Sequence, residues 1–287
     1  MRIHNPIRRG LSMDHPIHRQ SGFILAAFGA ALLSLAPGLA NAQISLESAQ
    51  AFGVFGFSTI TNTGPTVVNG NIGLAPGTSI TGFPPGTLVN GAIQINNAAA
   101  LQAKTDIDAA FTAINALPCS VTYGVAQDIS ALSPIDAVAT PVICFTSSAL
   151  ITGPVTINGP SGTPIVFKIG STLTVSNNAV ATLAGGMTCD QVSWGVGSSA
   201  TLGTNSTFVG DILAAASITL NTGAAASGRA FALNGAVTLD TNTVSPCSPP
   251  VVDANVANIP TLSAWGLIVL SGLMLLLGLR AKRIWAT

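Results

Sequence analysis

The sequence repeats one short pattern three times, as Thr201-Leu202-Gly203-Thr204, Thr219-Leu220-Asn221-Thr222 and Thr238-Leu239-Asp240-Thr241. The copies begin 18 and then 19 residues apart, a period that suits one coil of a β-solenoid. Around the copies, β-branched residues alternate with turns of Gly, Asn, Ser and Pro, which is typical of many short strands. We therefore predict an all-β domain built as a stack of coils.

Alternation along these strands assigns their two faces, because successive side chains on a strand point in opposite directions. The leucines of the pattern are apolar and are expected to point inward. The threonines before them then point outward, about 4.7–4.9 Å apart if the coils pair in register. This outward ladder consists of Thr201, Thr219 and Thr238.

A second face is expected to carry apolar residues on its outside. Aligning two neighbouring coils places Phe208 and Ile212 inward on this face and leaves Leu213 and Phe231 exposed side by side. Exposed apolar residues of this size need a cover.

Residues 96–117 are Ala-rich and predict that cover. Asn96 or Asn97 can act as the N-cap, and Pro118 follows the end of the segment. The apolar residues at helical spacing are Leu101, Ile107, Phe111, Ile114 and Leu117. We predict one amphipathic helix that covers the apolar face and leaves the threonine face free. Because residues 62–70 echo residues 221–228, this helix is expected to interrupt a single stack.

Both ends of the chain have the pattern of targeting segments. Residues 1–42 combine basic residues, an apolar run and the small-x-small site Ala40-Asn41-Ala42, which predicts a signal peptide and export by the general secretory route. Residues 261–287 contain an apolar run followed by Arg280, Lys282 and Arg283, which predicts a membrane-spanning helix. The remaining parts are then a domain at 43–247 and a Pro-rich linker at 248–260.

The four cysteines form an even set in a chain that is expected to be exported, which favours disulfides. They are Cys119, Cys144, Cys189 and Cys247. Three connectivities are open. Pairing Cys119 with Cys144 and Cys189 with Cys247 is preferred, because the second bond would tie down the last coil. A zinc site with four thiolates is the alternative, but the chain lacks the C-x-x-C spacing that supports one.

The charged residues of the domain exclude several function classes. Only Lys104, Lys168 and Arg229 are basic, so a nucleic-acid backbone would find little to bind. All three histidines lie in the leader, which removes the usual general base and metal ligand from the domain. We expect a protein that is not an enzyme and holds no cofactor or metal. A polysaccharide-cleaving solenoid with two carboxylates remains an alternative.

A rigid, flat array of hydroxyl and methyl groups suits a ligand that is itself a periodic lattice, and ice is such a ligand. Threonine is stiff at χ1, so ordering the array on binding costs little entropy. The competing interpretation is that Thr simply favours strands, as in solenoids that bind no ice.

Several motifs carry a resemblance to a known family. They are Ser58-Thr59-Ile60-Thr61-Asn62-Thr63-Gly64, Val68-Asn69-Gly70-Asn71-Ile72-Gly73, Gly82-Phe83-Pro84-Pro85-Gly86 and Ser199-Ala200-Thr201-Leu202-Gly203-Thr204. Through them, residues 51–244 resemble the ice-binding proteins of the DUF3494 type. The resemblance implies a discontinuous β-helix with three faces, a long helix packed alongside, and binding to ice through a flat face. The C-terminal segment, with Ile259-Pro260-Thr261-Leu262-Ser263 and Trp265-Gly266 before the apolar run, resembles the IPTL-CTERM type of sorting signal.

The expected partners are therefore an ice crystal surface, a membrane that the C-terminal helix crosses transiently, and a sorting protease. The threonines expected to contact ice are Thr201, Thr219, Thr238, Thr204, Thr222, Thr241, Thr207, Thr63 and Thr66. A structural or adhesive cell-surface module with the same fold is the alternative function. Either way, the domain is expected at the cell surface, in the outer envelope or outside the cell.

Overall fold

The repeated threonines lie on neighbouring parallel strands, as the period predicts. Thr201 is paired with Thr219, and Thr219 is paired with Thr238. The computed structural model describes residues 43–247, and the predicted signal peptide, linker and C-terminal segment lie outside the described residues. Within the described range no helix is long and apolar enough to cross a membrane.

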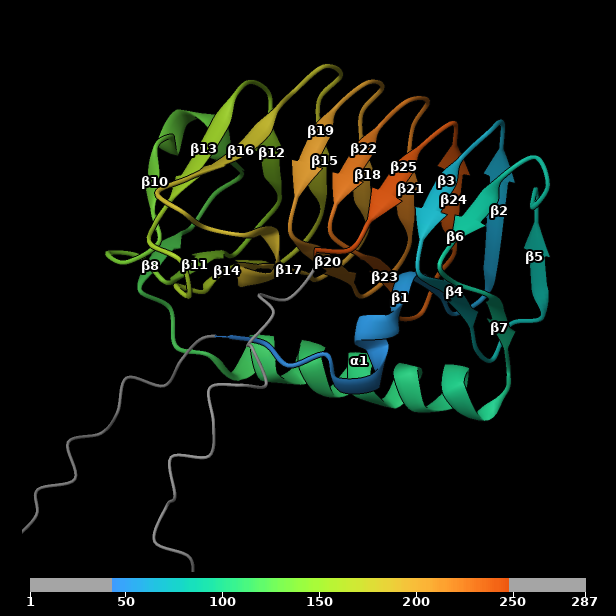
Figure 1. The fold of residues 1–287 in the computed structure, drawn as a ribbon. Helices are drawn as coiled ribbons and strands as arrows, with labels where there is room; N and C mark the ends of the chain where they lie inside the picture. The colour runs from blue at the N-terminus through green and yellow to red at the C-terminus, as the bar shows by residue number, and fades with distance from the viewer. Residues whose placement is uncertain (1–42, 248–287) are drawn as a thin grey trace, which may run out of the picture. The chain divides into compact units, whose positions relative to one another are not determined.

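Eight coils each contribute one strand to each of three faces, and one face has a further strand, which confirms the three-faced β-helix (Figure 1). Sheet A has nine strands, in the spatial order β7 (Ile93–Ile95), β4 (Asn71–Leu74), β1 (Phe52–Gly56), β23 (Ala230–Ala232), β20 (Asp211–Ala214), β17 (Val192–Val196), β14 (Ile165–Ile169), β11 (Val142–Phe145) and β8 (Val121–Tyr123). Sheet B has eight strands, in the order β5 (Ser79–Thr81), β2 (Thr59–Thr63), β24 (Val237–Asp240), β21 (Ile218–Leu220), β18 (Ala200–Leu202), β15 (Leu173–Val175), β12 (Ala149–Ile151) and β9 (Gln127–Asp128).

The third face is divided between two smaller sheets. Sheet C has five strands, β19 (Thr207–Val209), β22 (Ala225–Ser227), β25 (Thr243–Ser245), β3 (Val67–Asn69) and β6 (Thr87–Val89). Sheet D has three, β10 (Ile135–Asp136), β13 (Val155–Asn158) and β16 (Ala181–Ala184). A single bridge between Val180 and Thr207 joins them. Short 3-10 helices lie at Glu47–Ala51, Ile129–Leu132 and Cys189–Gln191.

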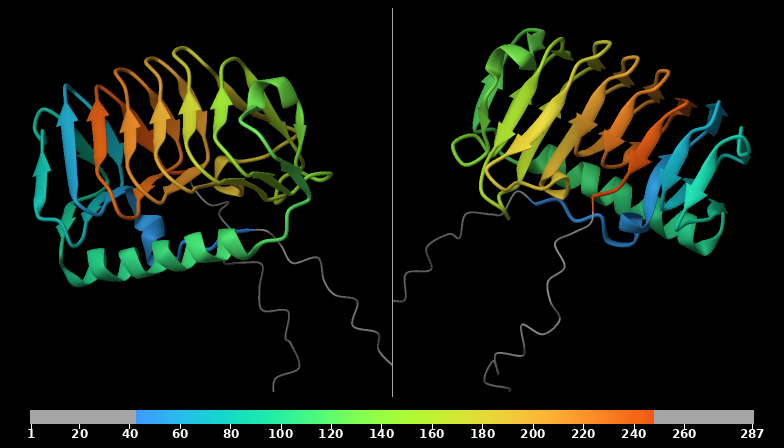
Figure 2. Two further views of the ribbon diagram at one scale, coloured as in Figure 1. Left: turned by 180° about the vertical axis from the view of Figure 1, so that it is seen from behind. Right: turned by 45° about the horizontal axis from the view of Figure 1, so that its top comes forward.

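The stack is continuous in space but discontinuous in sequence. Strands β1 to β7 form the first coils, α1 (Ala98–Ala116) then runs to the opposite end, and the chain builds back from β8. The last coil therefore meets the first one, and Val54 of β1 is paired with Ala230 of β23 (Figures 1 and 2). This arrangement confirms that the helix interrupts a single stack.

Helix α1 begins and ends close to the predicted residues. The Asn97 side chain caps it by accepting a hydrogen bond of 2.9 Å from the amide of Ala100. Its buried residues are Ala100, Ala103, Ile107, Ala110 and Ile114. The predicted apolar stripe was partly wrong, since Leu101 is 53% exposed. Alanines form much of the buried stripe, because small side chains let the helix approach the sheet closely.

The helix covers sheet A, as predicted from its apolar outer residues. Leu213 and Phe231 are paired neighbours on that sheet, and both are fully buried in a cluster with α1. Gly195 lies in the next strand, where an added Cβ would stand 2.5 Å from Cγ2 of Ile114. One detail of the prediction was wrong: Phe208 belongs to sheet C and Ile212 to sheet A, because the chain turns a corner at Gly210 between them.

The interior of the coils is filled by the predicted inward residues. Leu202, Leu220 and Leu239 are fully buried. Toward the β8 end, Trp194 stacks on Phe167 with ring centroids 3.9 Å apart, and its Nε1 donates to the carbonyl of Val209 at 2.9 Å. The burial of these apolar side chains is the main source of stability in such a fold.

Both preferred cysteine pairs are bonded in the structure. Cys119, just after α1, is joined to Cys144 on sheet A, and Cys189 is joined to Cys247 at the end of the last coil. The bonds close loops with sequence separations of 25 and 58 residues.

We expect each disulfide to contribute about 2–4 kcal/mol to the free energy of unfolding, because it restricts the unfolded chain. Replacing either pair with alanines, for example Cys189→Ala with Cys247→Ala, should therefore lower stability in denaturant unfolding. Thiol counting on the denatured, unreduced protein should find the domain fully oxidised. Four titratable thiols would contradict the pairing.

Candidate functional site

The outer surface of sheet B carries an unbroken column of six threonines. Register pairs join each member to the next, from β15 to β5. In spatial order the column is Thr174, Thr201, Thr219, Thr238, Thr61 and Thr81, and we call it the threonine column. At the usual spacing of parallel strands it extends over roughly 24 Å.

The positions beside the column are also small and mostly hydroxylated. Two residues before each member of the column in the sequence lie Thr172, Ser199, Ser217, Ala236, Thr59 and Ser79. Outward positions along a strand are about 6.6 Å apart, so the two rows form a lattice. In the second row, the hydroxyls of Ser199 and Ser217 accept hydrogen bonds from backbone amides of the next coil. The left view of Figure 2 shows the strands of sheet B as one even row.

Several features hold this lattice rigid. The residues between the outward positions, such as Leu202 and Ile218, are fully buried, so the strands cannot rotate without exposing the core. Threonine has few χ1 rotamers on a strand. Within residues 43–247 the structure shows no protein hydrogen-bond partner for the hydroxyls of the threonine column, which leaves them for water or ice.

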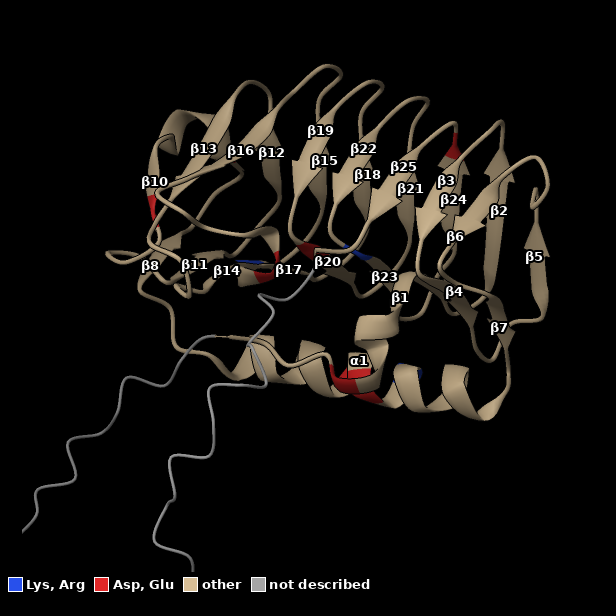
Figure 3. Ribbon diagram, in the orientation of Figure 1, with Lys and Arg blue, Asp and Glu red and all other residues tan. Residues whose placement is uncertain are grey.

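The basic residues of the domain all lie away from sheet B. Lys104 lies on α1, Lys168 on sheet A and Arg229 just before β23 (Figure 3). Asp240 is the charged neighbour of the column, and its carboxylate accepts hydrogen bonds from the hydroxyls of Thr222 and Thr241. Beyond Thr174 the column changes to Leu150 and Asp128, which marks its end.

The structure divides eight of the nine predicted threonines among four places. Thr201, Thr219 and Thr238 stand in the threonine column, and Thr63 is exposed at the end of β2 on the same sheet. Residues Thr204, Thr222 and Thr241 lie in the turns that follow sheet B, and Thr207 lies on sheet C. The role of these eight threonines in binding stays a prediction.

Thr66 requires a correction. It is fully buried, and its Oγ1 accepts a hydrogen bond of 3.0 Å from the amide of Asn242. It therefore cannot contact an external surface. Its sequence motif places it at a corner of the coil, where its hydroxyl joins two coils.

Three members of the column were not predicted from the sequence. Thr61, Thr81 and Thr174 do not precede a leucine, so they lie outside the repeated pattern. The alternation of apolar residues and Thr in β2 and β15 is the signal that could have found them.

The third face offers a poorer lattice. Its outward column on sheet C reads Thr207, Ala225, Thr243, Val67 and Thr87. Sheets C and D are joined by one bridge only, and a groove lined by Thr182, Met187, Val209 and Ser227 opens between them. Of the two faces that the helix leaves free, sheet B is the one whose strands pair without interruption.

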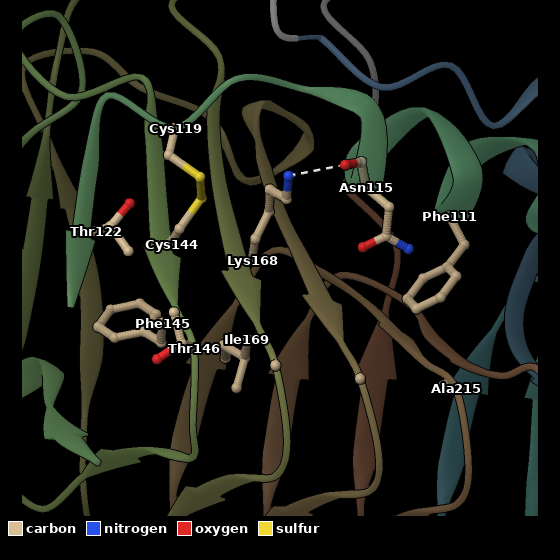
Figure 4. Close-up of a pocket in the computed structure, with 12 residues that line it drawn as sticks. Phe111, Asn115, Cys119, Thr122, Cys144, Phe145, Thr146, Lys168, Ile169 and Ala215 are labelled. Atoms are coloured by element: carbon tan, nitrogen blue, oxygen red, sulfur yellow. Dashed lines mark hydrogen bonds between the residues drawn. A yellow bond between two sulfur atoms is a disulfide. The ribbon is translucent and has the colours of Figure 1, made fainter. Parts of the chain in front are cut away.

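A separate pocket lies where α1 ends, between the helix and sheet A (Figure 4). Lys168 points from β14 toward the helix end, and its Nζ donates to the carbonyls of Asn115 and Leu117 at 2.9 and 2.8 Å. A cation at a helix C-terminus satisfies carbonyls that have no helical partner. The pocket is therefore explained by the attachment of the helix.

We expect Lys168→Met to lower the free energy of unfolding by about 1–2 kcal/mol, because two carbonyls lose a charged donor. The threonine column is on another face, so any activity of sheet B should be unchanged. Thermal unfolding together with an activity assay checks both statements. Unchanged stability would contradict this role of Lys168.

A buried ion pair lies where β20 and β23 of sheet A begin. Asp211 and Arg229 are each 4% exposed, and Nη1 of Arg229 contacts both carboxylate oxygens, at 3.2 and 3.0 Å. Burial raises the pKa of Asp211 to about 6, against the opposing attraction of Arg229. In the part of the chain that the structure describes, no group of His, Cys, Asp or Glu side chains could hold a metal ion.

Comparison with known proteins agrees with this geometry. Residues 54–245 match the Ice-binding-like family, and residues 257–283 match the IPTL-CTERM motif. An ice-binding protein of Nostoc sp. (strain HG1) is 43% identical over 235 residues, which cover 80% of this chain and 83% of that protein.

Solved structures give the same result. The crystal structure of an ice-binding protein from an Antarctic biological consortium is 39% identical, with a TM-score of 0.66 over 72% of this chain and 92% of its own. That of an ice-binding protein from the Antarctic ascomycete Antarctomyces psychrotrophicus is 36% identical, with a TM-score of 0.64 over 72% of this chain and all of its own. On its sequence and its fold, the chain belongs to the Ice-binding-like family.

Proposed function

We propose that the domain at residues 43–247 binds ice crystals through the outer surface of sheet B and so inhibits their growth or recrystallisation. The observation that carries this proposal is the threonine column, six in-register residues on one continuous face. Relatives that are named ice-binding proteins support the choice of ligand.

The mechanism follows from the periodicity of the face. Each methyl group excludes or orders a water molecule, and each hydroxyl hydrogen-bonds to one, so the column holds water at regular intervals. A single contact of this kind is weak. Because all positions repeat with the strands, many contacts form together once one is in register with the crystal. The rigid side chains lose little entropy on binding, which favours adsorption.

The domain is proposed to act by adsorption and not by catalysis. Its residues include no histidine, and the ion pair with Arg229 holds the buried carboxylate of Asp211. A polysaccharide-cleaving site would need two carboxylates facing an open cleft. The adhesive or structural module remains the second candidate, since it shares the fold and the flat face.

The location proposed for the protein is the cell surface or the medium. Export follows from the leader and the site Ala40-Asn41-Ala42, and the C-terminal motif supports sorting by a protease after transient membrane insertion. Mass spectrometry of the processed protein is expected to give an N-terminus at Gln43. An intact N-terminus at Met1 or Met13 would refute export by this route.

The proposal is tested by ice recrystallisation inhibition with the purified domain, residues 43–247. We expect crystals to stay small at protein concentrations where an unrelated protein of equal size has no effect. The reduced and unfolded domain serves as a matched control, because it has the same composition without the lattice. Coarsening equal to that control would favour the adhesive module.

A further inference from the structure

The N-terminal segment of the described chain forms a strap across the buried ion pair. Arg229 donates through Nε and Nη2 to the carbonyl of Gln50, at 3.3 and 3.1 Å. Leu46 and Ala49 are buried in the cluster under α1, and Ser48 hydrogen-bonds to Asp106 of the helix. The strap is therefore fixed from Leu46 onward, and its first residues lie beside the charged groups.

The small pocket beside the strap is lined by two carboxylates and one guanidinium, so one negative charge has no opposite charge beside it. Its lining includes Gln43, Asp190, Asp211 and Arg229. Asp211 and Arg229 neutralise each other at 3.0 Å. Asp190 is left over, and its repulsion contributes to raising the pKa of Asp211. Oδ1 of Asp190 is buried and has no hydrogen-bond partner among the described residues.

Side chains of the described domain cannot supply the missing cation. Besides Arg229 there are two basic residues between positions 43 and 247. Lys104 is paired with Asp108 at 2.6 Å, and Lys168 is bound to carbonyls at the end of α1. Asp190 is half-buried, and its buried Oδ1 has no partner among the described residues, so a cation generated at the pocket itself would stabilise the fold.

We propose that cleavage after Ala42 creates this cation, and that the new α-ammonium group of Gln43 pairs with Asp190 and fastens the strap. Hydrolysis of the Ala42–Gln43 peptide bond adds one water molecule, leaving a carboxylate on Ala42 and an amine on Gln43. With an ordinary pKa of about 7.7–8.0, that amine is mostly protonated at neutral pH. Removal of the leader thus supplies a positive charge beside Asp190. The inference rests on the predicted cleavage site and is independent of ice binding.

The test is a double-mutant cycle on the domain at residues 43–247, which contains both hydrophobic clusters and both disulfides. One protein begins at Gln43, and its matched control carries a single extra glycine in front. Each is made with and without Asp190→Asn, which preserves side-chain size. Mass spectrometry first verifies each N-terminus.

The extra glycine should lower Tm by about 2–4 °C when Asp190 is present, the shift for one modest ion pair in a domain of this size. With Asp190→Asn the two N-termini should unfold at the same temperature. Pairing raises the pKa of the amine, so the stabilisation is present below its unfolded value of about 7.7–8.0 and is lost as pH rises through the folded value. By about pH 10 the two Asp190 proteins should converge.

The proposal is overturned if the glycine has no effect, or if its effect is equal with and without Asp190→Asn. Finding a processed N-terminus other than Gln43 would overturn it as well. Loss of ammonia from Gln43 by cyclisation would do the same, since a cyclised terminus carries no ammonium.

Discussion

Arg229→Met is expected to lower the free energy of unfolding by about 3–5 kcal/mol, because it leaves a buried carboxylate without its partner. Asp211 is 4% exposed and accepts two hydrogen bonds from the side chain of Arg229, which the substitution removes. The same substitution frees the carbonyl of Gln50, which anchors the N-terminal strap. Denaturant unfolding at neutral pH measures the loss.

The pH dependence of the free energy of unfolding shows whether Asp211 causes this loss. In the native protein burial raises the pKa of Asp211 to about 6 from an ordinary value of 3.8, so the folded state binds this proton more tightly. The contribution of Asp211 to stability is therefore greatest at low pH and falls as pH rises through about 6. Without Arg229 this decline should extend to higher pH. Combining Arg229→Met with Asp211→Asn should recover part of the loss, and equal stability of the single and double variants would contradict the argument.

Thr219→Tyr is expected to reduce ice recrystallisation inhibition at least about tenfold, equal to ~1.4 kcal/mol of adsorption free energy. Thr219 lies inside the threonine column with Thr201 and Thr238 on either side. A tyrosine ring there stands above the plane and separates the neighbouring positions from a flat crystal. Stability should change by only about 0.5 kcal/mol, because the substitution is on the surface.

Thr243→Tyr is the matched control for that variant. Thr243 is an exposed outward threonine at the start of a strand, but it belongs to sheet C. The same ring on this face should leave activity unchanged. Equal loss in both variants would mean that the bulk of the side chain acts without regard to the face.

Much of the fold could be predicted from alternation and period, since these follow from strand geometry. The inward leucines, the outward Leu213 and Phe231 and the helix that covers them all followed from side-chain pattern. The order of the coils in space could not be predicted from this pattern. Thr238 is paired with Thr61, which is distant in the sequence, because the first coils stack on the last one.

The limits at the candidate site have equally specific causes. Thr61 lies outside the repeated pattern because Asn62 occupies the inward position that Leu239 holds in the neighbouring coil. The amide of Asn62 can be buried there because it donates to the carbonyls of Gly64 and Gly82, at 3.0 and 2.7 Å. The burial of Asp211 was also unforeseen, since its partner Arg229 lies in the next coil and a charged residue on a strand is usually exposed.

Partition into a growing ice hemisphere tests the central claim most directly, because it measures adsorption to ice itself. The native domain, Thr219→Tyr and Thr243→Tyr should be compared at equal concentration after folding has been verified. We predict that the native domain and Thr243→Tyr enter the ice to the same extent, while Thr219→Tyr remains in the liquid. Entry of Thr219→Tyr at the native level, or exclusion of the native domain, would contradict ice binding by sheet B.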